Sequence, residues 1–135
     1  MSNLAAKAYF VQDSFARLLG VELLSAQDGQ ACVTFFASSE HCNGLGGVHG
    51  AVIFALADIA FAVACNTRGH QAVGIHASIH YIHGARPGQM LATAHEVSCK
   101  SRLGHYLVNV TDSQGVLLAQ FSGMSYRLTV PAVSC

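Results

Sequence analysis

The chain has 135 residues, which suits one domain, residues 1–135, with a single hydrophobic core. Hydrophobic residues make up 52% of it and charged residues only 10%, below the roughly 25% of an average soluble domain. Lys plus Arg equals Asp plus Glu at seven each, so no basic field is present to attract nucleic acid. The excess of apolar residues predicts that another copy of the chain covers part of the surface.

The five cysteines are widely separated and form no C-x-x-C pair, unlike those of a disulfide framework or a zinc ribbon. This usage predicts a reducing compartment. The segment from Met1 to Gly20 carries charged residues among its apolar ones and lacks the clean apolar run of a signal peptide. The sequence therefore predicts a cytoplasmic protein.

The N-terminal part of the chain predicts one helix followed by a hairpin. Leu4 to Leu19 has apolar residues at helical spacing, and Gly20 follows it as a helix stop. Two strands are expected, at Val21 to Leu24 and at Ala31 to Ala37. The dipeptide Asp28-Gly29 between them is a strong signal for a tight hairpin turn.

A glycine-rich loop at Ser38 to Gly47 leads into an apolar stretch at Val48 to Asn66. This stretch predicts a helix that is apolar on all sides, and such a helix is buried. Its most apolar part, Ala51 to Ala64, is too short to cross a bilayer. Asp58 at its centre would also make a membrane span costly, so no membrane association is expected.

After Gly69 the apolar pattern changes to period two, which is typical of strands with one buried face. Four strands are predicted, at Ala72 to Ile82, Gln89 to Cys99, His105 to Thr111 and Val116 to Arg127. The segments between them, Arg86-Pro87-Gly88, Arg102-Leu103-Gly104 and Asp112-Ser113-Gln114-Gly115, are interpreted as hairpin connections. The expected fold class is α+β, with a long antiparallel sheet wrapped around a central buried helix, which is the hotdog arrangement.

Asp58 is the first candidate catalytic residue. It is the only Asp, Glu, Lys or Arg between His41 and Thr67, and Ala57 and Ile59 flank it. A carboxylate in such surroundings should have a raised pKa, and groups with perturbed pKa values concentrate at functional sites. The alternative is a structural carboxylate paired with a histidine or with backbone amides.

The entry into the central helix, from His41 to Gly50, is the second candidate. Glycines let the backbone approach a ligand closely, and the first N–H groups of a helix lack intrahelical acceptors. The N–H of Gly50 could therefore bind an oxyanion with help from the helix dipole. Gly50 and Asp58 lie eight residues apart, or about 12 Å along a helix. If both are catalytic, they must come from different subunits.

These segments resemble the PaaI-type hotdog thioesterases, a family named for phenylacetic acid degradation. The matching motifs are N-G-x-G-x-x-H-G from Asn43 to Gly50 and F-A-L-A-D-I-A-F-A-V-A-C-N from Phe54 to Asn66. Weaker matches occur in the predicted strands, including I-H-Y-I at Ile79 to Ile82 and F-S-G-M-S-Y-R from Phe121. The likeness extends over nearly the whole chain, from Leu4 to Leu128.

The resemblance implies hydrolysis of acyl-CoA or aryl-CoA thioesters by a homodimer or homotetramer. It assigns Asp58 as nucleophile or general base, and both routes stay open because each needs only a carboxylate near the carbonyl. It also implies that the Gly50 N–H polarises the thioester carbonyl, that Asn43 lines the site and that His49 supports the loop. The family commonly has a second glycine after H-G, where this chain has Ala51.

Substrate-binding residues are predicted in two groups. Phe54 and Tyr81 are expected mainly in the core, and they could also line the acyl pocket. The family often has basic residues at the turn that holds Lys100 and Arg102, which could bind the phosphates of coenzyme A; solvated surface charge is the alternative for both. Coenzyme A is part of the substrate, so no separate cofactor is expected.

Two other functions remain open, and a metal site is not expected. The same fold could dehydrate or hydrate 3-hydroxyacyl thioesters, with His49 and Asp58 converging across a dimer, or it could bind acyl-CoA without catalysis. Among the eight histidines, His76 and His80 share a strand face but His83 does not. No carboxylate or cysteine completes a closed metal site around them.

Overall fold

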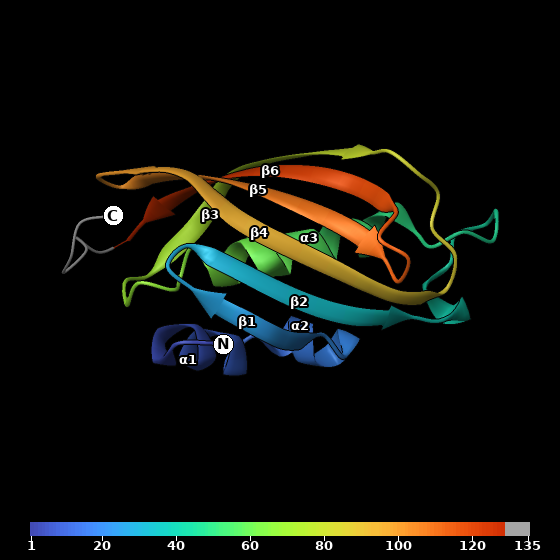
Figure 1. Cartoon of the computed structure of the whole chain (residues 1–135), viewed down its shortest axis with the longest axis horizontal. Coiled ribbons are helices and arrows are strands. Elements are labelled where there is room, and N and C mark those ends of the chain that lie inside the picture. Colours follow the sequence, from blue (N-terminus) through green and yellow to red (C-terminus); the bar gives the residue numbers. More distant parts are fainter. Residues whose placement is uncertain (129–135) are drawn as a thin grey trace.

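The computed structural model describes residues 1–128, and the tail after Pro131, for which the sequence predicts no element, lies outside them. Six strands form one antiparallel sheet, and helix α3 (Gly50–Ala64) lies against one face of it (Figure 1). This arrangement confirms the predicted α+β class with a sheet wrapped around a central helix. No helix of residues 1–128 has the length and hydropathy needed to cross a bilayer.

The six predicted strands are all present, with bounds that differ by a few residues from the predicted ones. The elements are α1 (Leu4–Val11), α2 (Ser14–Leu19), β1 (Glu22–Gln27), β2 (Gln30–Ala37), the 3-10 helix η1 (Ser39–His41), α3, β3 (Ala72–Tyr81), β4 (Gly88–Lys100), β5 (Leu103–Asp112) and β6 (Leu117–Arg127). The short helix η1 lies within the segment predicted to be only loop.

The single helix expected at Leu4 to Leu19 is wrong, because the chain forms two helices there. Asp13 has extended backbone and is the N-cap of α2, where its Oδ1 accepts a hydrogen bond from Ala16 N–H at 2.9 Å. A side chain that satisfies the N–H groups of a new helix start competes with continuation of the previous helix. Gly20 ends α2 in the left-handed conformation, with a φ of 81°, as predicted.

The β1–β2 hairpin is confirmed, but the connection at Arg86-Pro87-Gly88 is not a hairpin. Asp28 and Gly29 have φ values of 51° and 80°, as a type I′ turn requires. The strand order is β1-β2-β4-β5-β6-β3, so the chain between β3 and β4 crosses from one edge of the sheet to its middle. A turn signal shows where the chain bends and does not show which strand it joins next. β1 and β3 are the two edge strands.

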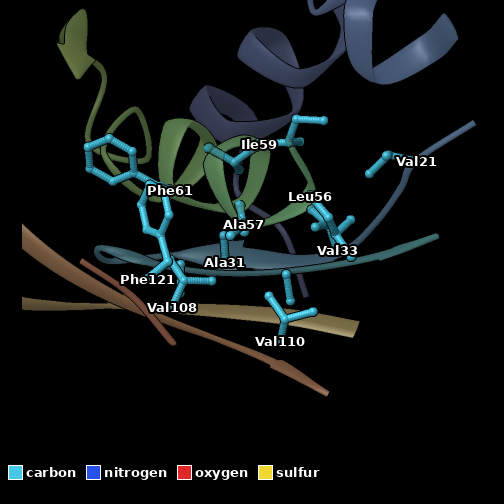
Figure 2. Packing of buried hydrophobic residues seen from close by; sticks show 14 of the residues in the cluster. Val21, Ala31, Val33, Leu56, Ala57, Ile59, Phe61, Val108, Val110 and Phe121 are labelled. Atoms are coloured by element: carbon cyan, nitrogen blue, oxygen red, sulfur yellow. The ribbon is translucent and has the colours of Figure 1, made fainter. Parts of the chain in front are cut away.

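The core lies between α3 and the inner face of the sheet. Figure 2 shows the side chains of α3, including Leu56, Ala57 and Phe61, packed over inner-face residues of the strands. Those residues include Ala31, Val33, Val108, Val110 and Phe121. Buried and accessible residues alternate along β5, in agreement with the predicted period of two.

Phe61 is one of the largest buried side chains, and it packs between the helix and the sheet. It is 2% exposed, and its ring centroid lies 5.6 Å from those of Tyr106 and Phe121. A Cβ atom on Gly74 or Gly123 would lie only 2.9 Å from the Phe61 ring. Residues without side chains at these two strand positions therefore let the sheet close over the helix.

The central helix is not buried on all sides, contrary to the prediction. Eight of its residues are buried, but Ala51 and Asp58 are exposed, and Ala55 and Ala62 are partly accessible. These four residues, here called the open stripe, follow one another at helical spacing and so lie on one side of α3. A single copy of the chain therefore covers α3 incompletely.

Candidate functional site

Capping interactions leave one backbone donor free at the start of α3. His49 is the N-cap, and its Nδ1 accepts a hydrogen bond from Ala51 N–H at 3.0 Å. The His49 carbonyl accepts hydrogen bonds from Val52 and Ile53 at 3.0 and 3.3 Å. No residue among 1–128 accepts a hydrogen bond from Gly50 N–H. Because the carbonyl of the same peptide is engaged twice, that free N–H is a polarised and strengthened donor.

Asn43 shapes the loop in front of this helix. Its Oδ1 accepts hydrogen bonds from the N–H groups of Leu45 at 2.9 Å and Gly47 at 3.2 Å. Its own N–H donates to the Gly47 carbonyl at 2.7 Å, and His49 N–H donates to the His41 carbonyl at 2.8 Å. The Asn43 side chain is therefore committed to holding the loop that presents Gly50.

A cavity of about 230 Å³ opens beside the start of α3. Its walls come from the loop before α3, from α3 itself and from the end of β3 with the segment that follows. Among the predicted site residues, it brings together Asn43, Gly50 and Tyr81. The Tyr81 hydroxyl donates a hydrogen bond to the Gly50 carbonyl at 3.0 Å, and 53% of the Tyr81 surface remains exposed.

His83 also lines this cavity, and the sequence prediction considered it only as a metal ligand. Its Nδ1 forms a hydrogen bond with the Gly84 carbonyl at 2.7 Å, which orients the ring. His83 follows β3, which is an edge strand of the sheet. No local signal in the sequence places it beside Gly50. No group of three or more His, Cys, Asp or Glu in residues 1–128 is arranged to hold a metal ion.

Asp58 lies on the open stripe, two turns along α3 from Gly50. Its side chain reaches solvent, yet the surrounding residues exclude enough water to raise the pKa of its carboxyl above the ordinary value of 3.8. The negative charge of Asp13 raises it further. The pKa of Tyr9 on α1 is about 12, raised mainly by burial and also by the charges of Asp13, Cys65 and Asp58. The raised pKa predicted for Asp58 is confirmed, although the residue faces an open side of the helix.

The other predicted binding residues lie apart from this cavity. Phe54 packs edge-to-face on Phe121, with ring centroids 5.4 Å apart, and so belongs to the core. Arg102 donates a hydrogen bond to the Arg127 carbonyl at 2.8 Å, and its guanidinium lies 5.6 Å from the centre of the Tyr126 ring. Lys100 is exposed at the same β4–β5 turn. β3 begins beside Arg127 and ends beside Ala119, so this turn is at the opposite end of the sheet from Tyr81.

Comparison with known proteins shows the family to which the chain belongs. The family model of the thioesterase superfamily matches residues 45–119, which is more than half of the chain and includes Gly50 and Asp58. The chain belongs to the thioesterase superfamily. It is 32% identical over 124 residues to the acyl-coenzyme A thioesterase PaaI of Escherichia coli K12, a match that covers 91% of this chain and 89% of that protein.

Solved structures place this thioesterase-superfamily chain with the PaaI proteins. The E. coli PaaI protein from the phenylacetic acid degradation operon matches with a TM-score of 0.90 and 32% identity, over 94% of this chain and 93% of that one. A mutant of the phenylacetic acid degradation protein PaaI from Thermus thermophilus matches with a TM-score of 0.82 and 37% identity, over 86% and 100% of the two chains. The predicted PaaI-type hotdog family and the thioesterase class are thereby confirmed.

Proposed function

We propose that this protein hydrolyses acyl-CoA thioesters to a free acid and coenzyme A. The observation that carries the proposal is the pairing, on one helix, of an unoccupied backbone donor at Gly50 and a carboxylate of raised pKa at Asp58. The similarity to a PaaI acyl-coenzyme A thioesterase supports acyl-CoA as the substrate class.

Each group has a defined part in the reaction. The Gly50 N–H donates a hydrogen bond to the thioester oxygen as negative charge develops on it, because this N–H is already in place and points away from the helix. Asp58 either removes a proton from the attacking water or attacks the carbonyl carbon itself. In the first route the carbon–sulfur bond breaks, and the leaving thiolate of coenzyme A takes up the proton that Asp58 removed from the water. In the second route the thiolate leaves an anhydride between the acyl group and Asp58; water hydrolyses this anhydride to the free acid and supplies the proton for the thiolate. His49 and Asn43 hold the peptide and the loop that present the donor.

We further propose that each site combines two copies of the chain. Gly50 and Asp58 are about 12 Å apart along α3, which is too far for one carbonyl carbon. β3 is an edge strand, and its apolar residues Val73 and Ile75 are 45% and 56% exposed. Pairing two such edges in a symmetric dimer covers them and turns the open stripe of each α3 toward the other copy.

Substitution of Gly50 tests the oxyanion donor. Gly50→Pro removes the N–H and should keep the helix start, because proline is well accepted at the first helical position and the extended backbone of His49, with a ψ of 135°, suits a following proline. Gly50→Ala is the matched control: it keeps the N–H, although its Cβ would also lie 3.1 Å from Tyr81. Thiol release from acyl-CoAs should fall about 10²- to 10³-fold in the proline variant. The loss in the alanine variant should be at least about tenfold smaller.

Mixing two inactive variants tests the shared site. Asp58→Ala and Gly50→Pro proteins are unfolded together and refolded as a mixture, so that hybrid dimers form. A hybrid has one site with both groups intact, and random mixing should restore about a quarter of wild-type activity. No recovery from a correctly refolded mixture would place both groups in one subunit. Full activity of Asp58→Ala would remove the carboxylate mechanism and favour acyl-CoA binding without catalysis.

A further inference from the structure

A second cavity, of about 390 Å³, lies between α1 and the connection from α3 to β3; we call it the α1 cavity. Ala5, Ala8 and Tyr9 of α1 form one wall, and Gly69 and His70 of the connection lie on the other. Gln12, Asn66 and Gln71 complete the lining, so polar side chains stand beside the alanines and the glycine. Nothing in the proposed mechanism uses this cavity.

The α1 cavity lies near Asp58. Asn66, which lines it, directly follows Cys65, and Cys65 is two turns after Asp58 on the same side of α3. The rise between Asp58 and Cys65 is about 10 Å. Tyr9 lines the cavity as well, and the charge of Asp58 acts on both Tyr9 and Cys65. The cavity therefore lies close to the C-terminal end of the open stripe.

His70 brings an unusual polar group to the cavity wall. It is 6% exposed, and its Nδ1 is buried without a hydrogen-bond partner among residues 1–128. Burial lowers the pKa of His70, and the positive charges of Arg127 and Arg68 lower it further. The lowered pKa favours the neutral ring, which has one donor nitrogen and one acceptor nitrogen. A ligand group that both donates and accepts hydrogen bonds suits either tautomer.

We propose that the α1 cavity is the acyl subsite, which holds the part of the acyl group beyond the reacting carbonyl and selects acyl groups with an uncharged hydrogen-bonding group at the far end. The inference rests on the proposed function, because it takes Asp58 as the point of reaction. A dry cavity of about 150 Å³ already binds benzene. The α1 cavity has room for more than an acetyl group.

A substitution that narrows the α1 cavity tests whether the acyl group occupies it. Ala8 is exposed on α1, so Ala8→Phe narrows the cavity without disturbing the core. Val11→Phe is the matched control, because Val11 is also exposed on α1 but lines a different depression. The ratio of kcat/KM for hexanoyl-CoA to that for acetyl-CoA should fall about tenfold or more in Ala8→Phe, since losing the contacts of two methylene groups suffices for that. An unchanged ratio, or an equal fall in Val11→Phe, would overturn the proposal.

Two substrates that differ by one hydroxyl group test whether His70 selects polar acyl groups. The preference for 6-hydroxyhexanoyl-CoA over hexanoyl-CoA should fall about two- to tenfold in His70→Leu, as for one lost hydrogen bond. His95→Leu, on the accessible outer part of β4, should keep the wild-type preference. Because His70 is buried, circular dichroism checks that the variant is folded, and Ala8→Phe carries the test if it is not. A preference that His70→Leu retains would contradict the polar selection.

Binding separates failure of the subsite from failure of the proposed function. If wild-type protein hydrolyses none of these thioesters, the same acyl-CoAs are titrated into it by calorimetry. Hexanoyl-CoA should then bind more tightly than acetyl-CoA to the wild type, and Ala8→Phe should remove that difference. Equal chain-length dependence in the two proteins would overturn the subsite, whatever the catalytic result.

Discussion

The hydroxyl of Tyr81 donates a hydrogen bond to the carbonyl oxygen of Gly50, 3.0 Å away, and so joins the end of β3 to the first turn of α3. The Tyr81 ring also lies where a Cβ atom on Gly50 would reach, 3.1 Å from its Cζ. The edge strand and the proposed oxyanion donor are thus held in one fixed relation. We therefore expect Tyr81 to position Gly50, in addition to lining the cavity beside it.

Tyr81→Phe should lower kcat by about two- to tenfold with little change in KM, because one neutral hydrogen bond contributes about 0.5–1.5 kcal/mol. The phenyl ring keeps the contact with Gly50, so the fold should be retained. Steady-state kinetics with one acyl-CoA measures the split between kcat and KM. A rise in KM at unchanged kcat would instead show that Tyr81 serves as a wall for the substrate.

Asp13→Asn should move the acid limb of the kcat/KM profile to lower pH. Asparagine is as good an N-cap as aspartate, so α2 is kept while the charge that helps to raise the pKa of Asp58 is removed. Asp112→Asn is the control, because Asp112 likewise accepts backbone hydrogen bonds, from Gln114 and Val116, but lies at the distant β5–β6 turn. A limb that stays in place in Asp13→Asn, or moves equally in both variants, would contradict the coupling.

Asp58→Asn should make the protein more stable at neutral pH. The folded-state pKa of Asp58 is raised above that of the unfolded chain, so the folded state binds the proton more tightly and the ionised carboxylate weakens the fold. This penalty is absent below the unfolded pKa of about 3.9 and grows as pH rises through the folded pKa. Thermal unfolding at pH 7 and near pH 4, at equal protein concentration, should show a gain in Tm that shrinks on acidification. A gain independent of pH would exclude this cause.

The ends of the elements could be predicted from the sequence because they depend on local chemistry. Asp28-Gly29 adopts positive φ at both residues and so defines its hairpin, and Gly20 ends a helix in the left-handed conformation. The strand order could not be predicted in the same way. Whether β4 follows β3 as a neighbour or crosses to β2 depends on packing against α3, which links residues far apart in the chain.

The features of the candidate site likewise differ in whether local sequence predicts them. The free N–H of Gly50 could be predicted, because every helix start leaves such donors. The exposure of Asp58 could not, since it depends on how much of α3 the sheet and α1 leave uncovered. The place of His83 beside Gly50 likewise depends on the crossover after β3.

A partly buried ion pair between Arg68 and Glu96 provides a test of stability away from Asp58. The two side chains are 23% and 14% exposed, with a nitrogen–oxygen distance of 2.7 Å, and Tyr106 donates its hydroxyl to Glu96 Oε1 at 2.9 Å. Glu96→Gln keeps an acceptor for Tyr106 but leaves the Arg68 charge uncompensated. The free energy of unfolding should fall by about 3 kcal/mol, the lower end for a broken buried pair, because both groups keep some contact with water.

The double variant Arg68→Met/Glu96→Gln separates lost pairing from lost packing. With no charge left unpaired, it should be more stable than Glu96→Gln alone, since replacing both partners of a buried pair is far less harmful than removing one. Urea unfolding at pH 7 measures both variants, and an unchanged m-value confirms that the same surface is exposed. If the double variant is destabilised as much as Glu96→Gln or more, the loss in Glu96→Gln arises from the changed contact with Tyr106 and not from the unpaired charge of Arg68.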